Sequence, residues 1–256
     1  MTTAKPILVL KIGGNQVEEE KFLEGFAAAA RGLLAEYALI VVHGGGKEIA
    51  DLHARLQVPF ETVDGLRVTN EESLGLVEMV LSGTVNTRLV RWLVNSGVDA
   101  IGLSGVDLGL VRVTPLTANG RDLGRVGQVV AVNEEALLQL LDIGLTPVIS
   151  PVSLGEDGLA YNVNADHVAT GVARAVEASR LIFVSNVPGV QVAGRTMRAL
   201  TVRQIDGLIT EGHITGGMIP KVRSATEAVV RGVHQSVITD LAGLARGEGT
   251  AVIHET

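Results

Sequence analysis

Two lysines in this sequence stand close to paired glycines. Lys11 ends the apolar run ILVL and is separated from Gly13 and Gly14 by one isoleucine, and Lys221 lies in TGGMIPKV, four residues after Gly217. A charged side chain in apolar surroundings needs a partner, and glycine lets backbone N–H groups approach an anion closely. We therefore expect each lysine to bind an anion, although Lys11 could instead extend past the edge of a sheet into water.

Two cations on separate parts of the chain could hold opposite sides of one phosphoryl group. Phosphoryl transfer is catalysed mainly by positioning the reactants and by neutralising charge on the phosphate oxygens. A carboxylate acceptor is already ionised at neutral pH, so its phosphorylation needs no general base. The absence of a convincing Ser/His/Asp or paired-carboxylate arrangement from the sequence agrees with this chemistry.

Four other polar residues could complete such a site. Asp166, in YNVNADHVA, could cap a helix or hold the two lysines by charge-assisted hydrogen bonds. Asn162 and Asn164 could orient a small polar substrate or stabilise a turn. Arg67, in DGLRVTN, could bind a carboxylate with both arms of its guanidinium, or it could be a solvated surface residue.

Composition excludes several other classes of protein. The 256 residues contain no cysteine, which rules out disulfides and thiolate metal sites, and the six histidines show no metal-ligand spacing. A formal charge of −7 without a basic run argues against nucleic acid as a partner. No apolar run reaches the ~18–20 residues that cross a bilayer, so we expect a cytoplasmic protein acting on small molecules.

The elements that carry these residues alternate in type. Strand-like apolar runs at 7–10 and 38–42 are each followed by an amphipathic stretch, at 18–35 and 46–57, which predicts βαβ units and a mainly parallel α/β sheet. The segments 111–116 and 124–132 predict a β-hairpin laid on this body. The other expected elements are helices at 71–95, 134–141, 165–177, 201–211 and 217–231, and strands at 99–103, 146–149, 181–185 and 236–239.

Glycines cluster where predicted strands end. The chain has 31 glycines, and clusters at 13–14, 44–46 and 102–105 each follow an apolar run. Ligands of open α/β sheets gather at the carboxyl ends of the strands, so phosphate or carboxylate binding fits, although such glycines also make tight turns. The P-loop pattern is absent, and HGGGKEI lacks the third glycine of the dinucleotide fingerprint.

In order and spacing, a series of motifs along the whole chain resembles the acetylglutamate kinases of the amino acid kinase superfamily. The motifs are KIGG (11–14), HGGGKEI (43–49), DGLRVT (64–69), VNTRLV (85–90), GLSGVD (102–107), GRVGQV (124–129), PVISPV (147–152), YNVNAD (161–166), SNVPGV (185–190), GGMIPKV (216–222) and GEGT (247–250). The resemblance implies a three-layer αβα sandwich around a mainly parallel open sheet. It also implies one continuous domain of two closely packed lobes, with residues 1–176 binding the acyl substrate and forming a homodimer and residues 177–256 binding ATP.

The resemblance also implies roles for individual residues. Lys11 and Lys221 would stabilise the transition state, Asp166 would organise them, and Mg²⁺ would be bound through the phosphates of ATP rather than by a protein metal site. The residues expected to bind the acyl substrate are Gly44, Gly45, Arg67, Asn162 and Asn164. Those expected to bind the nucleotide are Gly13, Gly14, Ser185, Asn186, Val187, Gly189, Val190, Gly217 and Met218.

Two departures from the family pattern concern the expected nucleotide contacts, and one of them also bears on the choice of substrate. Asn186 stands where the family usually has aspartate, and GVDLG (105–109) replaces the commoner Gly-x-Asp-Gly. SNVPG also resembles kinases that phosphorylate carrier-protein-linked aminoadipate or glutamate in lysine and arginine biosynthesis, and Arg121 and Arg125 could supply a basic surface for an acidic carrier. YNVNAD favours N-acetyl-L-glutamate, which would yield N-acetyl-L-glutamyl 5-phosphate in arginine biosynthesis.

The resemblance leaves two further alternatives and one expectation about assembly. A non-catalytic amino-acid sensor with this fold would be expected to lack a lysine, yet both Lys11 and Lys221 are present. Carbamate and uridylate kinases share the fold but not the pairing of NVNAD with DGLRVT. Arginine-inhibited relatives carry an additional N-terminal helix that joins dimers into a ring. Since only ten residues precede Lys11, we expect a homodimer without that form of inhibition.

Overall fold

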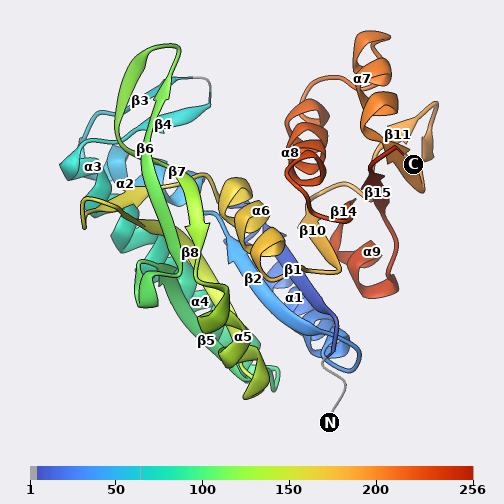
Figure 1. Ribbon diagram of the computed structural model, residues 1–256, viewed down its shortest axis with the longest axis horizontal. Coiled ribbons are helices and arrows are strands. Elements are labelled where there is room, and N and C mark those ends of the chain that lie inside the picture. Colours follow the sequence, from blue (N-terminus) through green and yellow to red (C-terminus); the bar gives the residue numbers. More distant parts are fainter. Residues whose placement is uncertain (1–4, 64, 256) are drawn as a thin grey trace.

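The computed structural model describes residues 5–63 and 65–255, in which one 11-stranded sheet runs through the molecule (Figure 1). The strand order is β13-β15-β14-β10-β1-β2-β8-β6-β7-β9, and β5 pairs with β8. The strands of this sheet are β1 (Ile7–Ile12), β2 (Ala38–His43), β5 (Ala100–Gly105), β6 (Val111–Ala118), β7 (Arg121–Val132), β8 (Thr146–Gly155), β9 (Ala160–Asn162), β10 (Arg180–Val184), β13 (Ala199–Thr201), β14 (Ser236–Thr239) and β15 (Thr250–Ile253). Asp64, which opens the DGLRVT motif, and residues 1–4 lie outside the described residues.

Strand β1 is central, and its two faces carry two different cores. Leu8, Leu10 and Ile12 pack with α1, α4 and α9 on one face, whereas Val9 packs with α5, α6 and α8 on the other. This alternation follows from the two-residue period of a strand, and it confirms the predicted three-layer αβα sandwich. The helices are α1 (Glu20–Leu33), α2 (Gly46–Leu56), α3 (Glu71–Glu78), α4 (Asn86–Asn95), α5 (Glu134–Asp142), α6 (Ala165–Ala175), α7 (Val202–Thr210), α8 (Met218–Val230) and α9 (Leu241–Arg246).

The centre of the sheet is parallel, as its sequence predicts. Strand β1 pairs in parallel with β2 and β10, and β8 pairs in parallel with β2 and β5. The predicted hairpin is present as β6 and β7, which pair antiparallel. The predicted helix at 71–95 is divided by a π-helical segment, Met79–Val85, that periodicity does not separate from an α-helix. Within the described ranges, no helix is both long and apolar enough to cross a membrane.

A second, smaller hairpin was not expected from the sequence. It consists of β3 (Glu61–Val63) and β4 (Leu66–Val68), whose few residues give too short a pattern to recognise. Thr69, directly after β4, joins it to β7: its N–H donates to the Leu123 carbonyl at 3.0 Å and its carbonyl accepts from the Arg125 N–H at 2.6 Å. Gly124 permits this approach, because its φ is +70° and a Cβ there would lie 2.4 Å from the Thr69 carbonyl oxygen. The docking of β4 on β7 fixes the segment that carries Arg67.

Candidate active site at the ends of β1, β2 and β10

Both lysines line one cavity of about 600 Å³ at the carboxyl ends of β1 and β10. The cavity therefore joins residues from the first strand to residues from α6 and α8, far apart in the sequence. This is the edge at which ligands of open α/β sheets bind. The lining residues are Lys11, Gly13, Gly14, Asn15, Gln16, Glu19, Gly46, Asp166, Phe183, Val184, Ser185, Asn186, Lys221, Ser224 and Ile238.

Lys11 is held by an ion pair rather than extended into water. It lies on the same face of β1 as Val9, the face that α6 covers, and its Nζ is 2.7 Å from Asp166 Oδ1. The two side chains are only 17% and 22% exposed, so solvent screens their attraction less than that of a surface pair. The other Asp166 oxygen, Oδ2, accepts a hydrogen bond of 2.7 Å from Ser224 Oγ on α8.

Asp166 is not the N-cap of its helix. That position belongs to Asn164, whose Oδ1 accepts from the Asp166 N–H at 2.8 Å, and the helix begins at Ala165. Asp166 instead lies in the first turn, where the helix dipole favours a negative charge. Its own burial would raise the pKa of Asp166, but the charge and hydrogen bond of Lys11 and the hydrogen bond from Ser224 outweigh burial and lower that pKa below its ordinary value.

Lys221 reaches the cavity from the first turn of α8 without a carboxylate partner in the described structure. Its Nζ donates to the Gly217 carbonyl at 3.4 Å. The expectation that Asp166 holds both lysines is therefore met only for Lys11. Asp166 contacts α8 through Ser224, which lies one turn after Lys221, so the carboxylate fixes the helix that carries the second cation.

The glycine loops after β1 and β2 are packed against each other. A Cβ on Gly14 would lie 2.7 Å from the Gly46 nitrogen and 2.8 Å from the Gly45 nitrogen, so no side chain fits between them. The Gly44 N–H also donates to the Ile12 carbonyl at 3.1 Å. These loops place backbone N–H groups beside the first turn of α2, which is a suitable place for an anion.

A smaller cavity of about 220 Å³ lies beside the first, and Gly46 lines both. The residues expected to bind an acyl substrate all line it: Gly44, Gly45, Arg67, Asn162 and Asn164. The Asn164 side chain caps α6, and the Asn162 Nδ2 donates to Thr69 Oγ1 at 3.2 Å. Among the described lining residues Arg67 is the only charged one, and it is surrounded by neutral amides, glycine backbone and apolar side chains.

Arg67 is positioned by its neighbours and retains one nitrogen for a ligand. Its guanidinium carbon lies 3.7 Å from the centre of the Phe60 ring, and its Nη2 donates to the Gly46 carbonyl at 3.3 Å. Nη1 is buried and has no hydrogen-bond partner in the described part of the chain. Burial lowers the pKa of Arg67, yet a guanidinium remains charged at neutral pH. A buried cation with a free donor is suited to a carboxylate.

The residues expected to bind the nucleotide fall into two groups. Gly13, Gly14, Ser185 and Asn186 line the larger cavity, whereas Val187, Gly189, Val190, Gly217 and Met218 are not among its lining residues. Val190 lies in the hydrophobic core, and its N–H donates to Thr250 Oγ1 at 2.8 Å. Gly189 has a φ of +147° and passes so close to Thr250 that a Cβ would lie 2.5 Å from its Oγ1. The second group therefore lies outside the lining, and its role in nucleotide binding stays a prediction.

Three residues of the site were missed by sequence reasoning. Ser224 holds Asp166, Phe60 supports Arg67, and His43 contacts the glycine loop after β2. Only His43 carries a local signal, because a polar residue ends the otherwise apolar strand ALIVV directly before three glycines. The partner of Ser224, Asp166, is distant in sequence. Phe60 meets Arg67 only because the short hairpin of β3 and β4 forms between them, and the sequence did not predict that hairpin.

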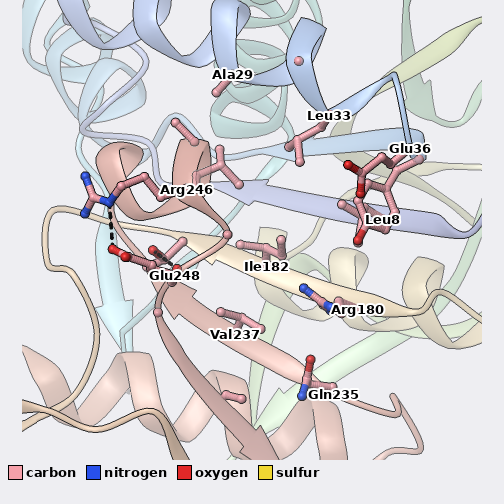
Figure 2. Close-up of a pocket in the computed structure, with 18 of the residues that line it drawn as sticks. Leu8, Ala29, Leu33, Glu36, Arg180, Ile182, Gln235, Val237, Arg246 and Glu248 are labelled. Carbon is pink, nitrogen blue, oxygen red and sulfur yellow. Dashed lines mark hydrogen bonds and ion pairs between the residues drawn. The ribbon is translucent and has the colours of Figure 1, made fainter.

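The largest of these cavities is elsewhere. It measures about 780 Å³ and is lined by Leu8 and Ile182, so it lies on the α1 face of the sheet, opposite the face to which Lys11 extends. Figure 2 shows this cavity, with the ion pair between Arg246 and Glu248, whose Nε and Oε2 atoms are 2.7 Å apart. Size alone therefore does not identify the site. Arginines and glycines line the largest cavity as well, so the site is identified by the position of the lysine-lined cavity at the carboxyl ends of β1 and β10.

Comparison with known proteins supports the assignment of the fold. The model of the amino acid kinase family matches residues 6–240. The acetylglutamate kinase of Chloroflexus aurantiacus is 52% identical over 255 residues, which cover 99% of this chain and 98% of that protein. A solved structure from Streptococcus mutans is 31% identical with a TM-score of 0.82, covering 97% of this chain and 99% of that one. The carbamate kinase of Giardia lamblia bound to AMP-PNP, at 15% identity, shares the fold with a TM-score of 0.72, over 98% of this chain and 99% of that one.

The Lys11–Asp166 ion pair predicts a defined pH dependence of stability. A carboxyl group whose pKa is lowered by folding stabilises the folded state above its unfolded pKa, and this contribution is lost as the pH falls through the folded pKa. Asp166→Asn should lower the free energy of unfolding by roughly 1–3 kcal/mol at pH 7, because it removes a charged hydrogen-bond acceptor. The difference from the wild type should shrink below about pH 4.

Urea unfolding at several pH values between 3 and 7 measures this difference. Asp206→Asn, at an exposed position on α7, is the control and should change the free energy of unfolding little at every pH. A difference between wild type and Asp166→Asn that stays constant from pH 7 to pH 3 would contradict the proposed role of the ion pair.

Proposed function

The chain belongs to the amino acid kinase family, and we propose that it transfers the γ-phosphoryl group of ATP to the side-chain carboxylate of N-acetyl-L-glutamate. The observation that carries the proposal is the junction of the two cavities at Gly46. One cavity contains Lys11 and Lys221, which suit a phosphoryl group, and the other contains Arg67, which suits a carboxylate. The 52% identity to an acetylglutamate kinase over nearly the whole chain supports the same acceptor.

In the proposed reaction the smaller cavity binds the acceptor and the larger cavity binds the phosphoryl group. Arg67 Nη1 and the Asn162 amide bind the α-carboxylate end of the acceptor, and the side-chain carboxylate points toward Gly44, Gly45 and the larger cavity. A carboxylate oxygen forms the new bond to phosphorus, the bond between the γ-phosphorus and the bridging oxygen breaks, and ADP leaves. Lys11 and Lys221 neutralise the charge on the transferred group, and no proton has to be removed from the acceptor.

The residues present fit a Mg²⁺ ion that enters with ATP. Mg²⁺ prefers oxygen ligands and is usually held by one or two protein groups together with substrate phosphates. The larger cavity offers the oxygens of Ser185, Asn186 and Glu19, whereas Asp166 is already paired with Lys11. Ser185 and Asn186 would assist the nucleotide phosphates in holding the ion. When bound, Mg²⁺ would neutralise part of the charge on those phosphates.

The carrier-linked acceptor is disfavoured by the surroundings of Arg121 and Arg125. Arg121 binds Glu61 with both nitrogens, one of them at 2.7 Å, and Arg125 Nη2 lies 3.1 Å from Glu71 Oε1. Arg125 Nη1 also lies 3.6 Å from Asp157 Oδ2. These arginines already have carboxylate partners within the chain, so they do not form a free basic surface for an acidic carrier.

The division into lobes and the assembly are part of the same proposal. The described residues that line the smaller cavity all lie between Gly44 and Ala165, whereas Ser185 and Lys221 bring the second part of the chain to the larger one. This distribution supports an acyl-binding lobe at residues 1–176 and an ATP-binding lobe at 177–256. Pairing of two copies through the first lobe stays a prediction from the resemblance.

The acceptor can be identified by trapping the acyl phosphate with hydroxylamine. The purified chain is incubated with ATP, Mg²⁺ and N-acetyl-L-glutamate, free glutamate or carrier-linked aminoadipate, and the hydroxamate is quantified. We expect the product with N-acetyl-L-glutamate to exceed the others by at least ~100-fold. The described lining of the smaller cavity contains no carboxylate to pair with the ammonium group of free glutamate, and Arg67 and Asn162 fit a small carboxylate better than a carrier-linked one. Preferential formation of the carrier-linked product would overturn the proposed acceptor.

Lys221 and Arg67 should affect different kinetic constants. Lys221→Ala should lower kcat by roughly 100-fold to 1,000-fold with little change in KM, because this cation acts on charge that develops in the transition state. Arg67→Ala should raise KM for the acceptor by at least ~10-fold and change kcat less, since it removes uniform binding.

Steady-state kinetics with both substrates varied separate the two effects. Arg223→Ala, at an exposed position on the helix that carries Lys221, is the matched control and should alter neither constant more than about twofold. Equal effects on kcat and KM in both site variants would refute this division of roles.

A further inference from the structure

His43 is a buried polar residue at the point where the acceptor cavity begins. It is the last residue of β2, it is 0% exposed, and it directly precedes the loop Gly44–Gly46. Its ring contacts the polar side chain of Asn86, which is 4% exposed at the start of α4. Room for Asn86 is provided by Gly102 on β5, where a Cβ would lie 2.1 Å from the Asn86 Oδ1. Three separate elements therefore meet around one imidazole.

The hydrogen bonds of Asn86 determine which histidine nitrogen carries the proton. Asn86 Nδ2 lies 2.8 Å from the Val148 carbonyl oxygen and 3.4 Å from the Leu103 carbonyl oxygen. Carbonyl oxygens only accept, so this atom must be the amide nitrogen and not the amide oxygen. Asn86 Nδ2 also lies 3.1 Å from His43 Nε2, which must then be the acceptor. The proton of a neutral ring therefore resides on Nδ1.

His43 Nδ1 has the Gly44 carbonyl as its partner. The two atoms are 3.2 Å apart, so the ring donates to the first peptide of the glycine loop. Burial lowers the pKa of His43 to about 4, although the hydrogen bond to Gly44 acts in the opposite direction. The ring is therefore neutral near pH 7 and keeps one donor and one acceptor nitrogen.

The orientation of the Gly44 carbonyl determines the orientation of the next N–H. In a trans peptide the C=O and the following N–H point in opposite directions, and the described residues contain no cis peptide bond. A Gly44 carbonyl turned toward His43 thus turns the Gly45 N–H away from it. Gly44 and Gly45 both line the smaller cavity, whose other polar groups include Arg67 and Asn162. Because glycine allows many backbone conformations, the orientation of the Gly44–Gly45 peptide has to be fixed by contacts with other residues.

We propose that His43 and Asn86 are positioning residues for the acceptor carboxylate, because they hold the Gly44–Gly45 peptide with its N–H directed into the smaller cavity. The inference rests on the proposed function, since it assigns the group that the Gly45 N–H binds. A fixed backbone donor at this place binds the reacting carboxylate as charge redistributes during transfer. Neither residue touches the phosphoryl group.

Two substitutions of His43 distinguish the effect of losing the Nδ1–H donor from the effect of changing the volume of the side chain. His43→Leu has similar volume but no donor, whereas His43→Asn places an amide nitrogen near the position of Nδ1. We expect His43→Leu to lower kcat/KM for N-acetyl-L-glutamate by at least ~10-fold and to leave the KM for ATP within about twofold. His43→Asn should recover most of the loss. His213→Leu, at an exposed position before α8, is the control and should keep wild-type constants.

Several outcomes would overturn the inference. If His43→Leu keeps wild-type kcat/KM, or if His43→Asn is as impaired as His43→Leu, the donor has no role in positioning. Long-range ¹H–¹⁵N NMR of the wild-type chain gives an answer even if His43→Leu does not fold: we expect a neutral ring with its proton on Nδ1 at pH 7, and a proton on Nε2 would refute the inference. A wild-type chain that phosphorylates no acceptor would instead refute the proposed function.

Discussion

The ion pair between Lys11 and Asp166 is the interaction on which the rest of the site depends. A cation at the end of a central strand, covered by a helix, is costly to bury unless an anion compensates it. The fold provides that anion by starting α6 at Ala165, so that Asp166 lies in the first turn on the face of β1 opposite to Leu8, Leu10 and Ile12. Because Ser224 donates to the same carboxylate, the position of α8, and with it of Lys221, follows from this pair.

The two cavities differ in charge in a way that suits two different anions. The larger one contains two lysines beside glycine backbone, with Asp166 paired to Lys11 and Glu19 also in the lining. Two cations are appropriate for the several oxygens of a phosphoryl group. In the part of the smaller one that the structure describes, the single charged group is the Arg67 guanidinium, whose unpaired nitrogen is buried beside neutral amides. Gly46 belongs to both, and the close packing of Gly14 against Gly45 and Gly46 leaves no side chain between the loops. The phosphoryl group of ATP and the carboxylate that receives it would therefore meet at a place where the protein contributes only backbone.

The sequence predicts most of the fold and part of the site. The features that it does not predict depend on exact helix ends or on contacts between separate segments. Strand β14 lies at the predicted 236–239, and Lys11 is recognisable because a charge interrupts an apolar strand. The choice between Asn164 and Asp166 as N-cap depends on where α6 begins, which periodicity gives only to within a residue or two. Phe60 meets Arg67 across the unpredicted hairpin of β3 and β4, and the carboxylate partners that Arg121 and Arg125 find on β3 and α3 are far away in the sequence. Such contacts between distant segments leave no local pattern.

Lys11 and Lys221 are proposed to act on the phosphoryl group while it is transferred, and an analogue of that group can test this role. Calorimetry can compare the Kd of ADP alone with the Kd of ADP, Mg²⁺, aluminium fluoride and N-acetyl-L-glutamate bound together, in the wild type and in Lys221→Met. We expect Lys221→Met to weaken the fluoride complex by at least ~100-fold and the binding of ADP alone by only a few-fold, because the cation is used mainly in the transition state. An equal loss in both complexes would contradict this role.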